Sequence, residues 1–190
     1  MKHATTREVF AYWDTCRGDR LAPDRSDIEP GAIRSVLCDT FILTFDRKAG
    51  HPFRLAGTRL CALMGCELKD EPFADLWNDH SRKEIENLLK TIAEETIGLV
   101  ASVTGEAEDG QTLDLELLLL PLSHRGRMPA RLLGALTPLR PPYWAGVKPV
   151  FELKLGQYRH LGPAVDIVSA PHFRAAPTEQ TDRRGLVVLQ

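Results

Sequence analysis

Apolar and polar residues alternate along five stretches of the chain with a period of two residues, which is typical of β-strands with one buried face. In residues 39–46, Phe41, Leu43 and Phe45 share one face, and the residues between them point to the other. Residues 112–122 begin with the same alternation and then become apolar on both faces, as in a central strand. The expected strands cover residues 39–46, 53–56, 98–107, 112–122 and 131–139.

Two longer stretches repeat their apolar residues every three or four positions, as amphipathic helices do. Each stretch opens with a hydroxyl residue three positions before a glutamate, Thr5 with Glu8 and Ser81 with Glu84. This spacing predicts a capping box at the start of both helices. We expect these helices at residues 5–16 and 81–96, and shorter helical turns at 30–37, 58–64 and 71–77.

The order of these elements indicates an α+β fold with antiparallel strands. A helix comes first, followed by two strands, short helices, a longer helix and three more strands. From Arg140 onward prolines recur and the periodicity fades, which predicts a domain over residues 1–142 and an irregular extension over 143–190. Within the extension, Pro149 to Tyr158 is expected to form either a short strand or a turn.

Composition excludes several classes of protein. The chain has 190 residues, of which 43% are hydrophobic, and its 26 acidic and 24 basic residues leave a net charge of -2. A protein that binds nucleic acid through many phosphates normally carries a basic excess, so no nucleic-acid partner is expected. The longest apolar run, Leu117 to Leu122, is too short to insert into a membrane, and the start of the chain lacks a secretory signal. We therefore expect a cytoplasmic protein.

The residues that most often bind metals or cofactors are scattered. None of the four cysteines forms a C-x-x-C pair, so neither a metal site nor a cofactor is expected. Cys61 and Cys66 are interpreted as small buried apolar residues, with reactive thiols as the alternative. His51 and His124 fall in expected turns and should be solvated. We find no catalytic constellation and expect no enzyme activity.

A set of spaced motifs resembles a known family. It consists of Tyr12-Trp13, Arg17-Gly18, the segment Leu21-Ala22-Pro23-x-Arg25-x-Asp27-Ile28-x-Pro30, Phe53-Arg54-Leu55-Ala56-Gly57-Thr58 and Phe73-Ala74-Asp75-Leu76-Trp77. Over residues 8–142 the chain resembles the PAS fold, and more specifically the standalone PAS family common in alphaproteobacteria. The resemblance implies a five-stranded antiparallel sheet with helices on one face and an N-terminal flanking helix. It also implies a regulatory protein without an output domain, of the kind linked to cell-cycle, polarity or motility control.

The resemblance also bears on two cofactors of PAS proteins. Flavin photosensors of this class carry a cysteine within an Asn-Cys-Arg-Phe type of motif, and the segment around Cys66 does not match it. Haem-type PAS domains use a helical histidine as the proximal ligand. His80 stands at a polar helix start, where an exposed residue is the simpler interpretation.

Two surfaces are candidates for partner binding. Arg17, Arg25 and Asp27 flank a proline-rich segment, where they form either structural contacts that hold the segment on the sheet or a shared recognition surface for a partner or an anionic ligand. The family motif also includes Gly18, Pro23 and Pro30. The first helix carries Val9, Phe10 and Trp13, which either pack internally or form a face for a partner or a homodimer.

Two functions remain open at this point. The first is a non-catalytic regulatory protein that acts through signalling proteins as partners. The second is a small-molecule sensor that binds a metabolite or nucleotide between the sheet and the short helices. The expected pocket residues are Leu43, Arg54, Cys61, Met64, Phe73 and Trp77. Arg54 belongs to this pocket only if its side chain points inward.

Overall fold

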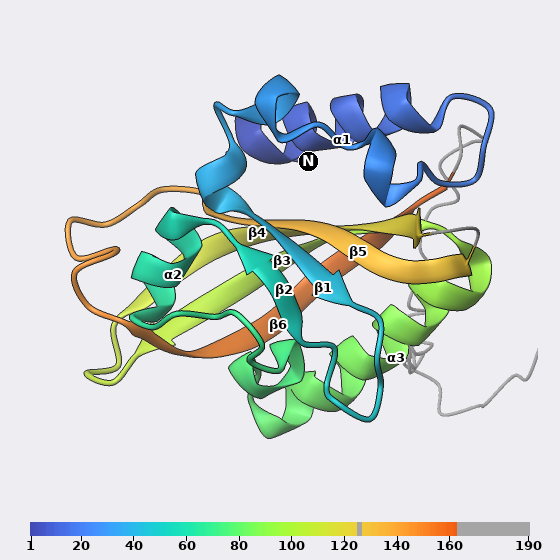
Figure 1. The fold of residues 1–190 in the computed structure, drawn as a ribbon. Helices are drawn as coiled ribbons and strands as arrows, with labels where there is room; N and C mark the ends of the chain where they lie inside the picture. Colours follow the sequence, from blue (N-terminus) through green and yellow to red (C-terminus); the bar gives the residue numbers. More distant parts are fainter. Residues whose placement is uncertain (125–126, 163–190) are drawn as a thin grey trace, which may run out of the picture.

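The computed structural model describes residues 1–124 and 127–162, and within them one antiparallel sheet of six strands lies between two layers of helices (Figure 1). The strand order is β2-β1-β5-β4-β3-β6. This architecture confirms the expected α+β fold of PAS type, with one strand more than the five expected. The strands are β1 Thr40–Thr44, β2 Phe53–Ala56, β3 Gly98–Ala107, β4 Thr112–His124, β5 Arg127–Pro138 and β6 Val150–Leu161.

Helices cover both faces of the sheet. The first helix, α1 (Ala4–Arg17), lies on one face together with the short 3-10 helices η1 (Arg25–Asp27) and η2 (Pro30–Ile33) (Figure 1). The other face carries α2, η4 and α3. The bounds of the remaining helices are η3 Leu37–Asp39, α2 Thr58–Met64, η4 Phe73–Leu76 and α3 Asp79–Glu95.

The sheet divides the apolar core into two clusters. In β1, Phe41 and Leu43 pack beneath α2 and α3, whereas Ile42 packs beneath α1. The central strand β4 alternates in the same way, with Leu117 on the first side and Leu118 on the second, both fully buried. Burying each such leucine contributes about 1.5–3 kcal/mol, so both clusters stabilise the sheet.

The sixth strand lies beyond the expected domain boundary at residue 142. It pairs with the outer edge of β3, from Gly98 opposite Leu161 to Ala107 opposite Val150. Of the two alternatives expected for Pro149 to Tyr158, the strand is therefore the one that forms, and it continues to Leu161. Leu153 is fully buried between exposed or half-buried neighbours, so the strand has one apolar face. Residues 163–190, which were also expected to be irregular, lie outside the described residues.

Both predicted capping boxes are wrong. The N-cap of α1 is His3, whose Nδ1 accepts a hydrogen bond from Thr5 N at 3.2 Å. The N-cap of α3 is Asn78, and the buried Ser81 instead accepts a hydrogen bond from Leu155 N of β6 at 2.9 Å. In both helices the hydroxyl residues face the interior, because packing against the sheet outweighs the local capping preference.

Candidate functional site

Four of the six expected pocket residues meet in the interior between the sheet and the helices. Leu43, Met64, Phe73 and Trp77 are all at most 7% exposed and belong to one core cluster. Cys61 is half-buried and packs at the margin of this cluster. The sequence therefore located the interior correctly for these positions.

Aromatic rings occupy this interior. The Phe73 ring lies 5.7 Å from the rings of both Phe41 and Phe53, and 5.6 Å from Trp77. Phe41 also lies directly over the backbone of Gly134, where an added Cβ would approach the ring to 2.1 Å. These contacts are those of a packed core, in which the side chains fill the space between sheet and helices.

The sixth expected pocket residue, Arg54, is exposed, which corrects its assignment to the pocket. Its neighbour Phe53 on β2 is 1% exposed and points into the interior. Because successive side chains of a strand point to opposite faces, Arg54 leaves the sheet on the side of α1.

The expected partner face of the first helix also needs correction. Val9 is fully buried and Trp13 is 4% exposed, and both pack against the sheet. The indole Nε1 of Trp13 donates to Pro121 O at 2.9 Å, which fixes α1 on β4. Phe10 is half-buried and stacks on Trp13 with a centroid distance of 6.1 Å. Val9 and Trp13 are thus core residues and do not form a binding surface.

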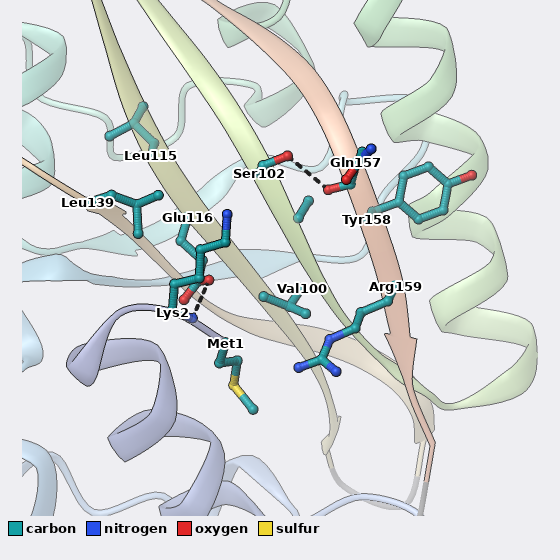
Figure 2. A pocket seen from close by; sticks show the side chains of 11 residues that line it. Met1, Lys2, Val100, Ser102, Leu115, Glu116, Leu139, Gln157, Tyr158 and Arg159 are labelled. Carbon is teal, nitrogen blue, oxygen red and sulfur yellow. Dashed lines mark hydrogen bonds between the residues drawn. The ribbon is translucent and has the colours of Figure 1, made fainter. Parts of the chain in front are cut away.

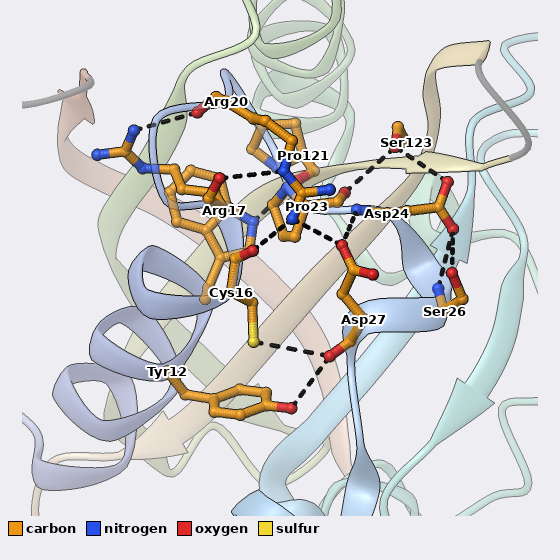
Figure 3. A network of polar contacts seen from close by, with 11 residues as sticks. Tyr12, Cys16, Arg17, Arg20, Pro23, Asp24, Ser26, Asp27, Pro121 and Ser123 are labelled. Carbon is orange, nitrogen blue, oxygen red and sulfur yellow. Dashed lines mark hydrogen bonds and ion pairs between the residues drawn. The ribbon is translucent and has the colours of Figure 1, made fainter.

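The motif residues at the end of α1 form the polar network in Figure 3. The guanidinium of Arg17 lies 5.7 Å from the Trp13 ring centroid and pairs with Asp14 at 2.7 Å. Gly18 ends the helix with a φ of +54°, a conformation that favours glycine, and its N–H donates to Asp14 O.

The proline-rich segment that follows is held on the sheet. Pro23 O accepts a hydrogen bond from Ser123 N of β4 at 3.0 Å. The Asp27 carboxylate accepts from Asp24 N at 3.0 Å and pairs with Arg20 at 2.8 Å (Figure 3). These contacts are structural, since each one ties the segment to itself or to its neighbours. Two further motif residues complete the turn, Arg25 donating to Ile28 O and Pro30 opening η2.

Glu116 of β4, which contacts the start of α1, is a structurally important residue that was not predicted from the sequence. Its carboxylate accepts hydrogen bonds from Lys2 N at 2.6 Å, from His3 N at 2.9 Å and from the Thr6 hydroxyl. Burial opposes ionisation, but these hydrogen bonds outweigh it and lower the pKa of Glu116. The carboxylate therefore anchors the start of α1 on β4. The signal in the sequence was a single acidic residue where β4 becomes apolar on both faces.

A groove of about 220 Å³ opens beside this anchor, between the chain start and strands β3 and β6 (Figure 2). Val100 and Leu139 provide apolar lining, and Lys2 and Arg159 add positive charge. Tyr158 of β6 lines the groove and is 39% exposed. This volume is below the ~300 Å³ at which small-molecule sites begin, and it fits a side chain of another protein better.

A second, polar cavity of about 580 Å³ lies between the start of α3 and β6. Two of its lining residues, Trp77 and Arg82, carry buried N–H groups without a hydrogen-bond partner among the described residues, the indole Nε1 and the guanidinium Nε. Phe151 of β6 lines the same cavity and is 68% exposed. Unpaired buried donors are costly, so these two groups are candidate contacts for a hydrogen-bond acceptor.

His51 departs from the expectation of a solvated turn. It is 1% exposed, and its ring lies 4.9 Å from Phe45. Burial lowers the pKa of His51, so the neutral imidazole is favoured. His124 is half-buried, and His80 is exposed as expected.

The two cysteines near α2 are not equivalent. Cys61 is half-buried, whereas Cys66 is exposed, which corrects the interpretation of Cys66 as a buried residue. Partial burial and the neighbouring Cys61 raise the pKa of the Cys66 thiol, which disfavours a reactive thiolate. Among the described residues, no group of three or more His, Cys, Asp or Glu side chains is arranged to hold a metal ion. No described helix is both long and apolar enough to cross a membrane.

A family model described as PAS domain matches residues 1–137, which is most of the chain. No curated protein matches the chain.

Solved structures give remote similarities. A light-oxygen-voltage domain studied with a flavin analogue is 15% identical, with 62% of this chain and 87% of that chain covered and a TM-score of 0.45. A PAS domain of an HTR-like protein from Haloarcula marismortui is 17% identical, with coverages of 57% and 90% and a TM-score of 0.41. A PAS domain from Colwellia psychrerythraea is 14% identical, with coverages of 58% and 97% and a TM-score of 0.43. Similarity this remote carries no argument about ligands or partners.

Proposed function

The chain belongs to the PAS domain family, and we propose that it is a non-catalytic regulatory protein that acts through contacts with signalling proteins. PAS domains have sensory and signalling roles, and their own fold supplies no reaction chemistry. We propose a role in bacterial control of the cell-cycle, polarity or motility type, which the motif resemblance implies, and a cytoplasmic location, which the composition of the chain favours.

The observation that carries this proposal is the packed interior. Phe41, Phe53, Phe73 and Trp77 fill the space where a sensor of this fold would bind its ligand. Opening a cavity there would require these rings to separate, at a cost of several kcal/mol of lost packing. A signal therefore reaches this domain more readily through its surface than through its interior.

Exposed aromatic residues on the edge strand supply a surface for a partner or for a second copy of the chain. Tyr158 and Phe151 of β6 are 39% and 68% exposed. Tyrosine and tryptophan in particular are enriched among residues that dominate binding energy at interfaces. Tyr158 is among the residues that line the groove, and its ring points away from Val100 and Glu116 (Figure 2).

The proposal is tested by capturing partners with the tagged full-length chain in its own host and then measuring the affinity of each captured protein. Tyr158→Ala should weaken partner binding by roughly tenfold or more. Tyr143→Ala is the matched control, because Tyr143 is 90% exposed and does not line the groove. Equal affinities for both variants would exclude this surface. A wild-type chain that captures no specific partner would contradict the proposed function.

A small-molecule sensor is the second candidate function, and the unpaired indole Nε1 of Trp77 favours it. A metabolite or nucleotide that accepts this hydrogen bond would bind in the polar cavity beside α3. Native mass spectrometry of freshly purified protein should then show added mass that is lost in Trp77→Phe, which removes the N–H donor and keeps an aromatic ring, although a smaller one. If both proteins show only the mass of the polypeptide, the result would count against the small-molecule sensor.

A further inference from the structure

Three arginines from separate elements gather at one end of the sheet on the side of α1. Arg131 of β5 stands opposite Thr44 of β1 in the strand register, and its Nη1 donates to the Thr44 hydroxyl at 2.9 Å. On the other side of β1, Phe53 of β2 pairs with Leu43, so Arg54 follows one position beyond that pair. The strand order therefore places Arg54 and Arg131 on either side of one strand.

The third arginine, Arg25, comes from η1. This short helix is attached to β4 at Ser123, which forms a bridge with Asp24. The residue before Ser123 pairs with Arg131 of β5. Arg25 therefore lies over the same end of the sheet, and we call Arg25, Arg54 and Arg131 the arginine cluster.

The arginine cluster has no ion pair with any carboxylate in residues 1–124 or 130–162. Arg25 donates to the neutral carbonyl of Ile28, and Arg131 donates to the neutral hydroxyl of Thr44. Burial, followed by the charges of Arg54 and Arg25, lowers the pKa of Arg131. The three cations thus repel one another, and an added anion would relieve this repulsion.

We propose that the arginine cluster docks an acidic polypeptide segment of a partner protein, with carboxylates paired to the guanidinium groups. This inference rests on the proposed function and names the chemistry of the partner. Guanidinium and carboxylate match in planar, bidentate geometry. Arg54 is exposed and the other two are half-buried, so all three are accessible to a partner. The net charge of -2 does not favour a nucleic acid as the partner, because nucleic-acid binders normally carry a basic excess.

Fluorescence anisotropy with a fluorescein-labelled octaglutamate peptide and the full-length chain tests this proposal. Arg25→Gln combined with Arg54→Gln should weaken binding roughly fivefold or more, and added salt should reduce the difference. The matched control is Arg34→Gln with Arg140→Gln, which changes the net charge equally at two exposed arginines. Arg54→Glu alone is the second variant, since the exposed Arg54 side chain forms no hydrogen bond or ion pair with the described residues, and it should weaken binding more than Arg140→Glu.

Equal weakening by the cluster variants and the control would overturn the proposal, as would the absence of any peptide binding by the wild type. Tighter, cluster-dependent binding of an octathymidylate or of phosphatidylserine vesicles would also overturn it, in favour of a different class of partner. The captured partners separate this failure from that of the proposed function. A partner that binds Arg54→Glu as tightly as the wild type excludes the arginine cluster alone, whereas the capture of no partner contradicts the proposed function itself.

Discussion

Single residues decide how α1 is held on the sheet. Glu116 lies 110 positions beyond Thr6, yet its carboxylate receives the Thr6 hydroxyl and two backbone N–H groups of the chain start. A local capping pattern predicts Thr5 as the helix start, because nothing within the first turn reveals an acceptor so distant in sequence. The residue at which α1 begins is therefore determined by tertiary contacts.

Replacing Glu116 by glutamine should destabilise the protein by about 2 kcal/mol near neutral pH, because the amide leaves buried donors poorly paired. The folded state lowers the pKa of Glu116 below its ordinary value of 4.5, so its contribution is complete above that value. The contribution is lost as the pH falls through the folded pKa. Chemical unfolding of wild type and Glu116→Gln between pH 3 and pH 7 should therefore show a stability difference that shrinks on acidification.

Glu108→Gln provides the control for this prediction, since Glu108 is exposed in the turn between β3 and β4. Its stability should follow that of the wild type over the whole range. A Glu116→Gln difference that stays constant from neutral to acidic pH would show that the carboxylate charge does not hold α1.

At the scale of elements, the period of two residues located most of the sheet. The bounds of β2 and β3 agree with the prediction. The alternation of side chains along a strand also implies that Arg54 points away from the buried Phe53. The assignment of Arg54 to the pocket did not take this into account. Trp77 and Leu43 could be placed together because the resemblance supplied the arrangement of helices over the sheet, which local periodicity alone does not contain.

Strand β6 was left open between a strand and a turn for a physical reason. It contains the alternation from Phe151 to Leu155, but prolines precede it and its pairing partner β3 lies about fifty residues earlier. Strand formation here depends on a free sheet edge and on Ser81 of α3, which accepts the hydrogen bond from Leu155 N. Neither condition is visible within the segment.

Ser81→Ala should therefore destabilise the protein by about 1–3 kcal/mol, since it leaves the half-buried Leu155 N–H without its acceptor. Hydrogen exchange of the Leu155 amide should accelerate more than that of other β6 amides. Thr91→Ala is the control, since the half-buried Thr91 hydroxyl donates to Asn87 O of the same helix, and it should leave this exchange unchanged. Unaltered Leu155 exchange in Ser81→Ala would show that the side chain does not secure β6.

At the scale of the whole molecule, the described residues form a sheet enclosed on both faces, and Trp13 and Phe10 on α1 therefore have different roles. Trp13→Ala should cost about 3–5 kcal/mol, because it empties a buried site beneath α1 and removes the donor to Pro121. Phe10→Ala should cost much less, since Phe10 is half-buried. Urea unfolding of both variants measures the difference. Similar losses would mean that α1 does not use Trp13 as its main contact.

The place of β6 at the far edge of the sheet has a consequence for synthesis on the ribosome. Strands β3, β4 and β5 emerge and can pair before residues 150–161 have left the exit tunnel, so the outer side of the ten-residue strand β3 stays uncovered for that interval. Uncovered strand edges recruit other chains. A nascent protein of this kind benefits from a chaperone that covers the open edge of β3 until β6 has emerged. Translational stalling before residue 150 would produce an aggregation-prone fragment.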